Sequence, residues 1–165
     1  MASIKIRSDP FDAAFRDIVA AKINEARKTI KIVTGEIAAY NYHDLRTAAE
    51  EAAERGVDIE VYATGPDRDI INRLIHNKIK VYIGKDDPKE HFMICDGKEI
   101  VISEKGDLRT KPTPMGNRRG RIVNSRSELR RHIQIFKRLI SKAVKARMEG
   151  EDPLVRALRE PVSAE

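Results

Sequence analysis

The sequence predicts a single α/β domain: a mixed, mostly parallel sheet flanked by helices, with a late β-hairpin and a long C-terminal helix. Strand-like segments alternate with segments of helical apolar spacing, an Asp-Gly pair marks the hairpin, and one long amphipathic stretch lies near the C-terminus. The 165 residues suit one domain, and a hydrophobic content of 41% is enough for a core. We expect the domain to span residues 1–148 and residues 149–165 to form a polar, frayed tail.

The first elements are expected in the order strand, helix, strand. Residues 4–7 alternate like a short strand. Asp9-Pro10 then starts a helix, because aspartate can cap free N–H groups and proline fits the first helical position. Apolar residues continue at helical spacing to Ala26, and residues 29–34 read as a buried strand.

Two further helix–strand units follow. A helix rich in alanine ends at Gly56, and residues 57–63 alternate as a strand. After Pro66-Asp67, another helix ends near Asn77, and a strand follows at 79–83. Single helices between strands indicate βαβ crossovers, so the sheet is expected to be mainly parallel.

The pattern then changes to a hairpin and a helix. Two strands at 92–95 and 99–102 are joined by Asp96-Gly97, a pair favoured in two-residue hairpin turns. Residues 105–117 read as a loop, and residues 121–123 as a last strand. Ser125 with Glu128 has the spacing of a capping box, and it introduces a helix whose apolar stripe continues to Ala143.

Positive charge is concentrated near the C-terminus. Residues 118–147 hold eleven basic residues and one acid, Glu128, whereas the rest of the chain has a net charge of −4. Such asymmetry indicates a polyanionic partner, and the competing interpretation is a solvated helix face. If nucleic acid is the partner, the candidate contacts are Arg121, Arg130, Arg131, Lys137, Arg138 and Lys142.

Several classes of protein and site are disfavoured. No segment approaches the ~18 apolar residues that span a bilayer, and the N-terminus has no apolar leader. Cys95 is the only cysteine, which suits a reducing, cytoplasmic location. No zinc spacing or phosphate-binding glycine motif is present, so no metal or cofactor is expected. The lack of tryptophan and the abundant charge are typical of a heat-adapted source.

The chain resembles the phospholipase D superfamily over nearly its whole length, and most closely that family's short single-motif nucleases. The resemblance rests on the segments IKIRSDP, ARKTIKIVTGEIAAYNYHDLRTAAEEAAERGVDIEVYATG and EHFMICDGKEIVIS. The last segment is similar to the region of the His-x-Lys-(x)4-Asp motif. Asp96 stands at the position of the motif's Asp, but Lys89 occupies the His position and His91 the Lys position.

The resemblance implies a two-step cleavage of phosphodiesters through a phosphohistidine, in a homodimer. Lys89 is a poor nucleophile, because an ordinary lysine pKa of ~10.4 leaves it protonated at neutral pH. We therefore expect a non-catalytic domain that binds an anionic ligand, either nucleic acid or a phosphorylated small molecule, as a homodimer. The residues expected at the anion site are Lys89, His91, Ser103, Lys105, Arg118 and Arg119.

Two alternatives stay open. An active, metal-independent phosphodiesterase would need a permuted site of His91, Lys89 and Asp96, with His91 displaced by ~6.6 Å along the strand from the nucleophile position. A sensor or interaction domain, like the effector modules that some archaeal transcription regulators build on this fold, would act through a partner. His132, beside the apolar stripe of the last helix, is expected to be structural.

Overall fold

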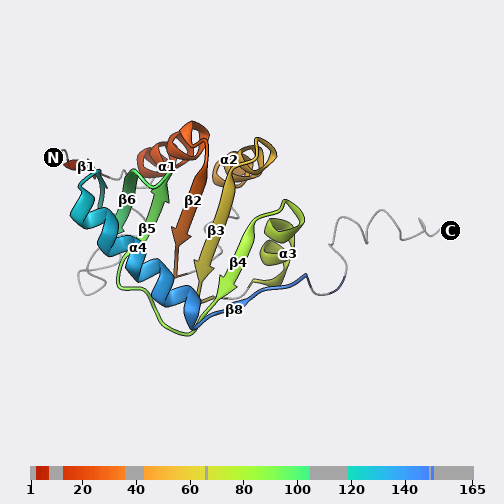
Figure 1. Cartoon of the computed structure of the whole chain (residues 1–165). Helices are drawn as coiled ribbons and strands as arrows, with labels where there is room; N and C mark the ends of the chain where they lie inside the picture. Colours follow the sequence, from red (N-terminus) through yellow and green to blue (C-terminus); the bar gives the residue numbers. More distant parts are fainter. Residues whose placement is uncertain are drawn as a thin grey trace, which may run out of the picture.

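The structure is a computed structural model that describes residues 3–7, 13–35, 43–65, 67–104, 119–148 and 150. Within these residues, eight strands form one sheet with helices on both of its faces (Figure 1). The predicted α/β class, the hairpin and the long C-terminal helix are confirmed. The elements in chain order are β1 (Ser3–Arg7), α1 (Ala13–Glu25), β2 (Thr29–Val33), α2 (His43–Glu54), β3 (Asp58–Ala63), α3 (Arg68–His76), β4 (Lys80–Ile83), β5 (His91–Cys95), β6 (Glu99–Glu104), β7 (Arg119–Val123), α4 (Arg126–Ser141) and β8 (Val144–Lys145).

The pairing of the strands corrects the expectation of a mostly parallel sheet. The strand order is β1-β7-β6-β5-β2-β3-β4-β8, and among the described strands only the β2–β3 and β3–β4 pairs are parallel. The other pairs are antiparallel. The reason is that β1 pairs with β7 instead of β2, and that β5 enters the sheet beside β2 in the opposite direction.

Two hydrophobic cores lie on the two faces of the sheet. Helices α1, α2 and α3 cover one face, where Ile23, Ala52 and Ile71 pack on alternate strand residues such as Met93. Helix α4 crosses the other face, where Phe136 packs on the intervening strand residues. This alternation places neighbouring strand residues on opposite faces of the molecule, which decides where each candidate site residue points.

Local predictions are partly confirmed. Asp96 and Gly97 both have positive φ, at 53° and 64°, as a tight turn of the primed type requires, and Lys98 N–H donates to the Cys95 carbonyl at 3.0 Å. Asp67 caps α3 by accepting from the Ile70 N–H. The prediction of a capping box is wrong. Ser125 occupies the N-cap position, but its side chain makes no capping hydrogen bond, because its hydroxyl pairs with the hydroxyl of Ser127.

Other predictions differ at the C-terminal end or lie outside the described residues. Helix α4 ends at Ser141, and the residues after it form β8 along the edge of β4. Asp9-Pro10, the loop at 105–117 and nearly all of the expected tail are not among the described residues. No helix within the described part of the chain is both long and apolar enough to span a bilayer.

Candidate anion site and basic helix

A row of polar residues crosses the sheet at the end where β2 finishes and β5 begins. His91 of β5 pairs with Ser103 of β6, and Ser103 pairs with Gly120 of β7. Thr34 directly follows Val33, the β2 partner of Phe92, and so extends the row. Thr34 and Ser103 are buried, and His91 is half-buried. The row lies on the face that α1, α2 and α3 cover, because Met93 and Val101, two residues away, pack in that core.

The imidazole of His91 is held by the backbone of Gly35. The Gly35 N–H donates to Nε2 at 3.1 Å, and the Thr64 hydroxyl donates to the Gly35 carbonyl. A Cβ at residue 35 would lie 2.8 Å from His91 Nε2 and 3.6 Å from Asp87 Oδ1, so glycine permits this close approach. In a neutral ring that accepts at Nε2, the proton resides on Nδ1. His91 therefore has its Nε2 lone pair committed to a backbone donor.

Lys89 and Glu90 lie on the connection between β4 and β5, beside this row. Lys89 is exposed. Glu90 reaches the opposite face, where its carboxylate contacts His132 Nε2 of α4 at 3.0 Å. The structure therefore brings His91 and Ser103 together, with Lys89 two residues before His91.

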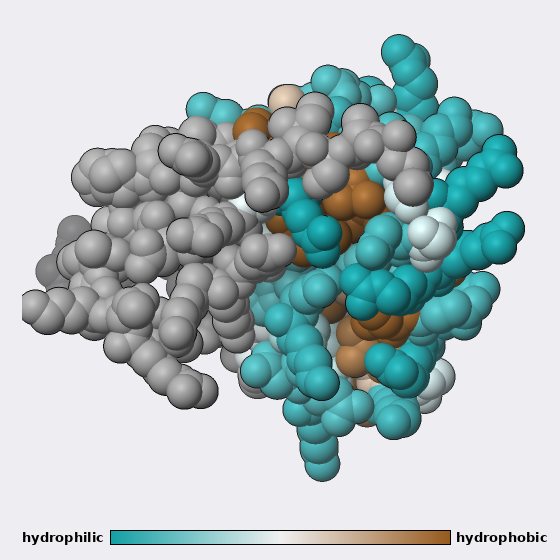
Figure 2. Space-filling view, turned by 90° about the vertical axis from the view of Figure 1, so that its left-hand side faces the viewer, coloured by the Kyte–Doolittle hydropathy of each residue, from teal (hydrophilic) through white to brown (hydrophobic). Residues whose placement is uncertain are grey.

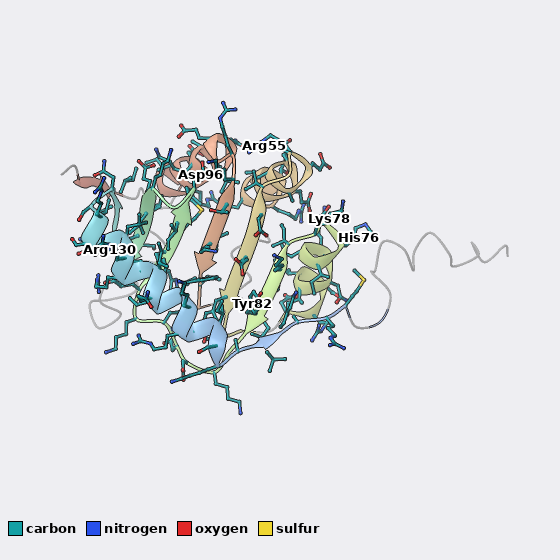
Figure 3. The ribbon with its side chains drawn as sticks, viewed as in Figure 1. Arg55, His76, Lys78, Tyr82, Asp96 and Arg130 are labelled. Atoms are coloured by element: carbon teal, nitrogen blue, oxygen red, sulfur yellow. The ribbon has the colours of Figure 1, made fainter. Side chains whose placement is uncertain are left out.

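Asp96 is not part of this group. It lies at the far end of β5 (Figure 3). Five residues separate it from His91, which is about 17 Å at the usual rise per strand residue. The backbone N–H groups of residues 27–29 donate to its carboxylate over 2.7 to 3.1 Å. Burial alone would raise the pKa of this carboxyl, but those donors and the charge of Lys98 outweigh it and hold the pKa below its ordinary value. Asp96 thus joins the hairpin to the α1–β2 turn.

The remaining predicted anion contacts are only partly visible. Lys105 and Arg118 lie outside the described residues. The backbone of Arg119 pairs with Arg7 and Glu104 at the start of β7. Three residues beside His91, namely Thr34, Gly35 and Asp87, were not predicted. Thr34 and Gly35 could have been found as a Thr-Gly pair at the carboxyl end of a buried strand, which is a common position for ligand contacts.

Helix α4 and its C-cap residue carry a set of exposed cations, which we call the basic face. Figure 2, which views the molecule from the side of the N-terminal half of α4, shows long hydrophilic side chains projecting from this side. Of the cations on the basic face, Arg131 alone makes ion pairs within the described part of the chain, to Glu128 at 3.1 Å and to Glu90 at 3.8 Å. The basic face consists of Arg126, Arg130, Arg131, Lys137, Arg138 and Lys142, all exposed.

Arg121, the remaining predicted nucleic-acid contact, differs from these residues. It belongs to β7, is half-buried and has an interaction partner. No group of three or more His, Cys, Asp or Glu side chains among the described residues is arranged to hold a metal ion.

Comparisons with known proteins match the chain by structure alone: no family model and no curated protein matches its sequence. The phospholipase D family member Nuc from Salmonella typhimurium superposes with a TM-score of 0.71 at 14% identity, over 88% of this chain and 98% of Nuc. NucT from Helicobacter pylori gives a TM-score of 0.69 at 12% identity, over 88% and 99% of the two chains.

A third solved structure has a different described role. TrmBL2, an archaeal chromatin protein with a novel mode of DNA binding, superposes with a TM-score of 0.62 at 17% identity. The match covers 88% of this chain and 55% of TrmBL2. The chain therefore corresponds to about half of that protein.

Proposed function

We propose that this chain, which has the phospholipase D fold, binds nucleic acid through the basic face of α4 without cleaving it. The observation that supports the proposal most strongly is the set of exposed cations on that helix that have no acidic partner among the described residues. Cations on a folded surface without local counter-charges favour a polyanion. One of the solved structures with this fold, TrmBL2, is a chromatin protein that binds DNA, which is consistent with this partner.

The dimensions of the basic face suit a nucleic-acid backbone. Helix α4 has sixteen residues and is therefore about 24 Å long. Double-stranded DNA carries one charge per ~1.7 Å of axis, so several phosphates fall within reach of one helix. Contacts from flexible lysine and arginine side chains to phosphates position a protein on DNA without reading its sequence. We therefore expect weak dependence on sequence and strong dependence on salt.

The polar row supports binding over catalysis. A histidine nucleophile needs an available ring lone pair, whereas His91 Nε2 accepts the Gly35 N–H. Lys89, at the position of the expected nucleophile, is exposed. We propose that Lys89, His91 and Ser103 form a separate phosphate contact, on the face of the sheet opposite α4, and that the protein acts as the homodimer implied by its resemblance to single-motif nucleases. Sedimentation equilibrium tests the dimer directly.

A salt titration with a short DNA duplex tests the nucleic-acid proposal. Fluorescence anisotropy should show log affinity falling linearly with log salt, by about 0.9 for each neutralised phosphate. Replacing Arg130, Lys137 and Arg138 with glutamine should lower the slope by about 2.7. The matched control replaces Lys28, Lys78 and Lys98, exposed cations at the Asp96 end of the sheet, and should leave the slope unchanged.

Two results would contradict the proposal. Absence of duplex and RNA binding at low salt would exclude a nucleic-acid partner. Cleavage of plasmid DNA or of a generic phosphodiester that disappears in His91→Ala would instead establish the active, permuted site.

A further inference from the structure

His132 is a fully buried histidine that the proposed contacts with nucleic acid do not use. It belongs to α4, and none of its side chain is exposed. The ring of Phe92 packs against it edge-on, with the two centroids 4.8 Å apart. A buried imidazole must satisfy both ring nitrogens, because an unpaired polar atom in the core costs ~1–3 kcal/mol. The partners of these nitrogens therefore fix how many protons the ring holds.

Both nitrogens of His132 face oxygen atoms. Nδ1 lies 2.8 Å from the Glu128 backbone carbonyl, which can only accept a hydrogen bond. Nε2 lies 3.0 Å from Glu90 Oε2. A neutral imidazole with its proton on Nδ1 would direct a lone pair at an ionised Glu90, and this contact would be repulsive. Both ring nitrogens can donate only if the ring holds one more proton, carried on Nε2 and donated to the Glu90 carboxylate.

Charged groups from α4 and β7 lie near this proton. Arg131 of α4 approaches Glu90 at 3.8 Å and Glu128 at 3.1 Å. The Glu128 carboxylate lies 3.6 Å from Nδ1, and its hydrogen bond from Arg131 holds the pKa of that carboxyl below the ordinary value. Arg121, from β7, also acts electrostatically on Glu128. With its proton, the His132–Glu90 pair is neutral overall. Without it, the pair has a charge of −1 between Lys89 and the basic face.

We propose that the His132–Glu90 pair is a proton-linked latch, which joins the anion site to the basic helix and makes nucleic-acid binding dependent on pH. Glu90 lies between Lys89 and His91, so the latch holds that segment against α4. Loss of the proton adds one negative charge beside the nucleic-acid contacts and removes the bond that positions the segment. Both changes weaken the binding of a polyanion. By linkage, the bound polyanion in turn favours the protonated pair.

The binding part of this inference rests on the proposed function, whereas the protonation state of His132 can be measured without any ligand. Nitrogen-15 NMR of the histidine side chains should find protons on both ring nitrogens of His132 at neutral pH. In Glu90→Gln the amide can donate to Nε2, so the contact survives without the extra proton and Nε2 should carry none. His76→Gln, at an exposed position on α3, is the matched control and should leave the His132 signals unchanged.

Duplex affinity, measured as the pH is raised through neutrality and above, tests the link to binding. The wild type should lose roughly fivefold in affinity, and His76→Gln should behave the same way. Glu90→Gln fixes the pair at zero charge and should keep the low-pH affinity throughout. His132→Gln leaves Glu90 ionised and should bind weakly at all pH values, which provides a second variant if Glu90→Gln fails to fold.

The outcomes separate the two proposals. A single proton on His132 at neutral pH, or the same pH dependence in wild type and Glu90→Gln, would overturn the latch. Absence of any duplex binding at low salt would overturn the proposed function, and the NMR result on the latch would still be interpretable.

Discussion

At the scale of single residues, Asp96 stabilises the fold, although it occupies the aspartate position of the motif that indicated a catalytic site. Its carboxylate accepts from three consecutive backbone N–H groups at the α1–β2 turn. Its own backbone adopts a positive φ in the hairpin turn. One side chain therefore connects two turns that are almost seventy residues apart in the sequence.

We predict that Asp96→Asn lowers the free energy of unfolding by about 1–2 kcal/mol, because bonds to a charged acceptor are stronger than those to a neutral one. Asparagine tolerates the positive φ, so the change isolates the charge. The folded-state pKa is lowered, so the contribution is present above the ordinary aspartate value of ~3.9 and is lost as the pH falls through the folded value. Urea titrations of both proteins at several pH values check this.

The control is Asp58→Asn, which removes a surface ion pair with Lys80. Exposed pairs of this kind contribute little, so its effect should stay below about 1 kcal/mol. Equal losses of unfolding free energy in both variants would mean that the backbone donors to Asp96 stabilise the fold no more than a surface ion pair does.

We predict that Gly35→Ala displaces His91, because the new Cβ would lie 2.8 Å from Nε2. Crowding of this kind costs about 1–3 kcal/mol in a packed site. The double variant Gly35→Ala/His91→Ala should lose less unfolding free energy than the two single variants lose together. The reason is that the new Cβ clashes only with the imidazole, which the second change removes. Thermal unfolding of the four proteins in the cycle measures this coupling, and strict additivity would count against the contact.

His91 and Ser103 could be predicted as site residues because motif spacing and strand alternation both act within short stretches of sequence. Thr34 and Gly35 could not, because they meet His91 through the β2–β5 pairing, which joins residues almost sixty positions apart. Asp96 was grouped with His91 from its spacing in the motif. Because β5 runs from His91 to Cys95, the two residues lie at opposite ends of this strand and cannot share one site.

At the scale of elements, the helices and strands followed from apolar periodicity, but their pairing did not. Single helices between strands suggested parallel neighbours, and this holds for β2, β3 and β4. It fails for β1, whose antiparallel partner is the distant strand β7 at Arg119–Val123. Strand β8 was missed because the apolar stripe of α4 continues past its end and a two-residue strand has no period of its own.

We predict that Ala146→Pro detaches the segment around β8 from β4. The Ala146 N–H donates to the Val81 carbonyl at 2.8 Å, and proline removes that donor. The expected loss is about 1–3 kcal/mol, the usual cost of leaving a buried backbone acceptor unpaired. Hydrogen exchange should show faster exchange in β4 and unchanged protection in β6. Ala146→Ser keeps the N–H and should preserve protection throughout.

At the scale of the whole molecule, one sheet separates two cores that are built from alternate residues of the same strands. Phe136 belongs to the core under α4, and Ile71 to the core under α1, α2 and α3. Each is almost completely buried. The two cores share the backbone of the sheet but no side chains, so they should contribute separately to stability while unfolding together.

We predict that Phe136→Ala costs about 3–5 kcal/mol and Ile71→Ala about 2–5 kcal/mol. Because the two side chains lie on opposite faces of the sheet, the losses should add to within about 0.5 kcal/mol in the double variant. Each variant should still unfold in one transition, followed by both circular dichroism and tyrosine fluorescence. Two separate transitions would show that the faces unfold independently.

The pairing of β1 with β7 also has a consequence for how the chain is made. Ser3 faces Val123, so β1 leaves the ribosome about 120 residues before its partner strand. Pairings of such long range are slow to form because the intervening chain must be ordered first. Between the synthesis of β6 and that of β7, the outer edge of β6 is open and able to pair with another nascent chain. Pulse-labelled hydrogen exchange during refolding should find the amides of β1 among the last to be protected.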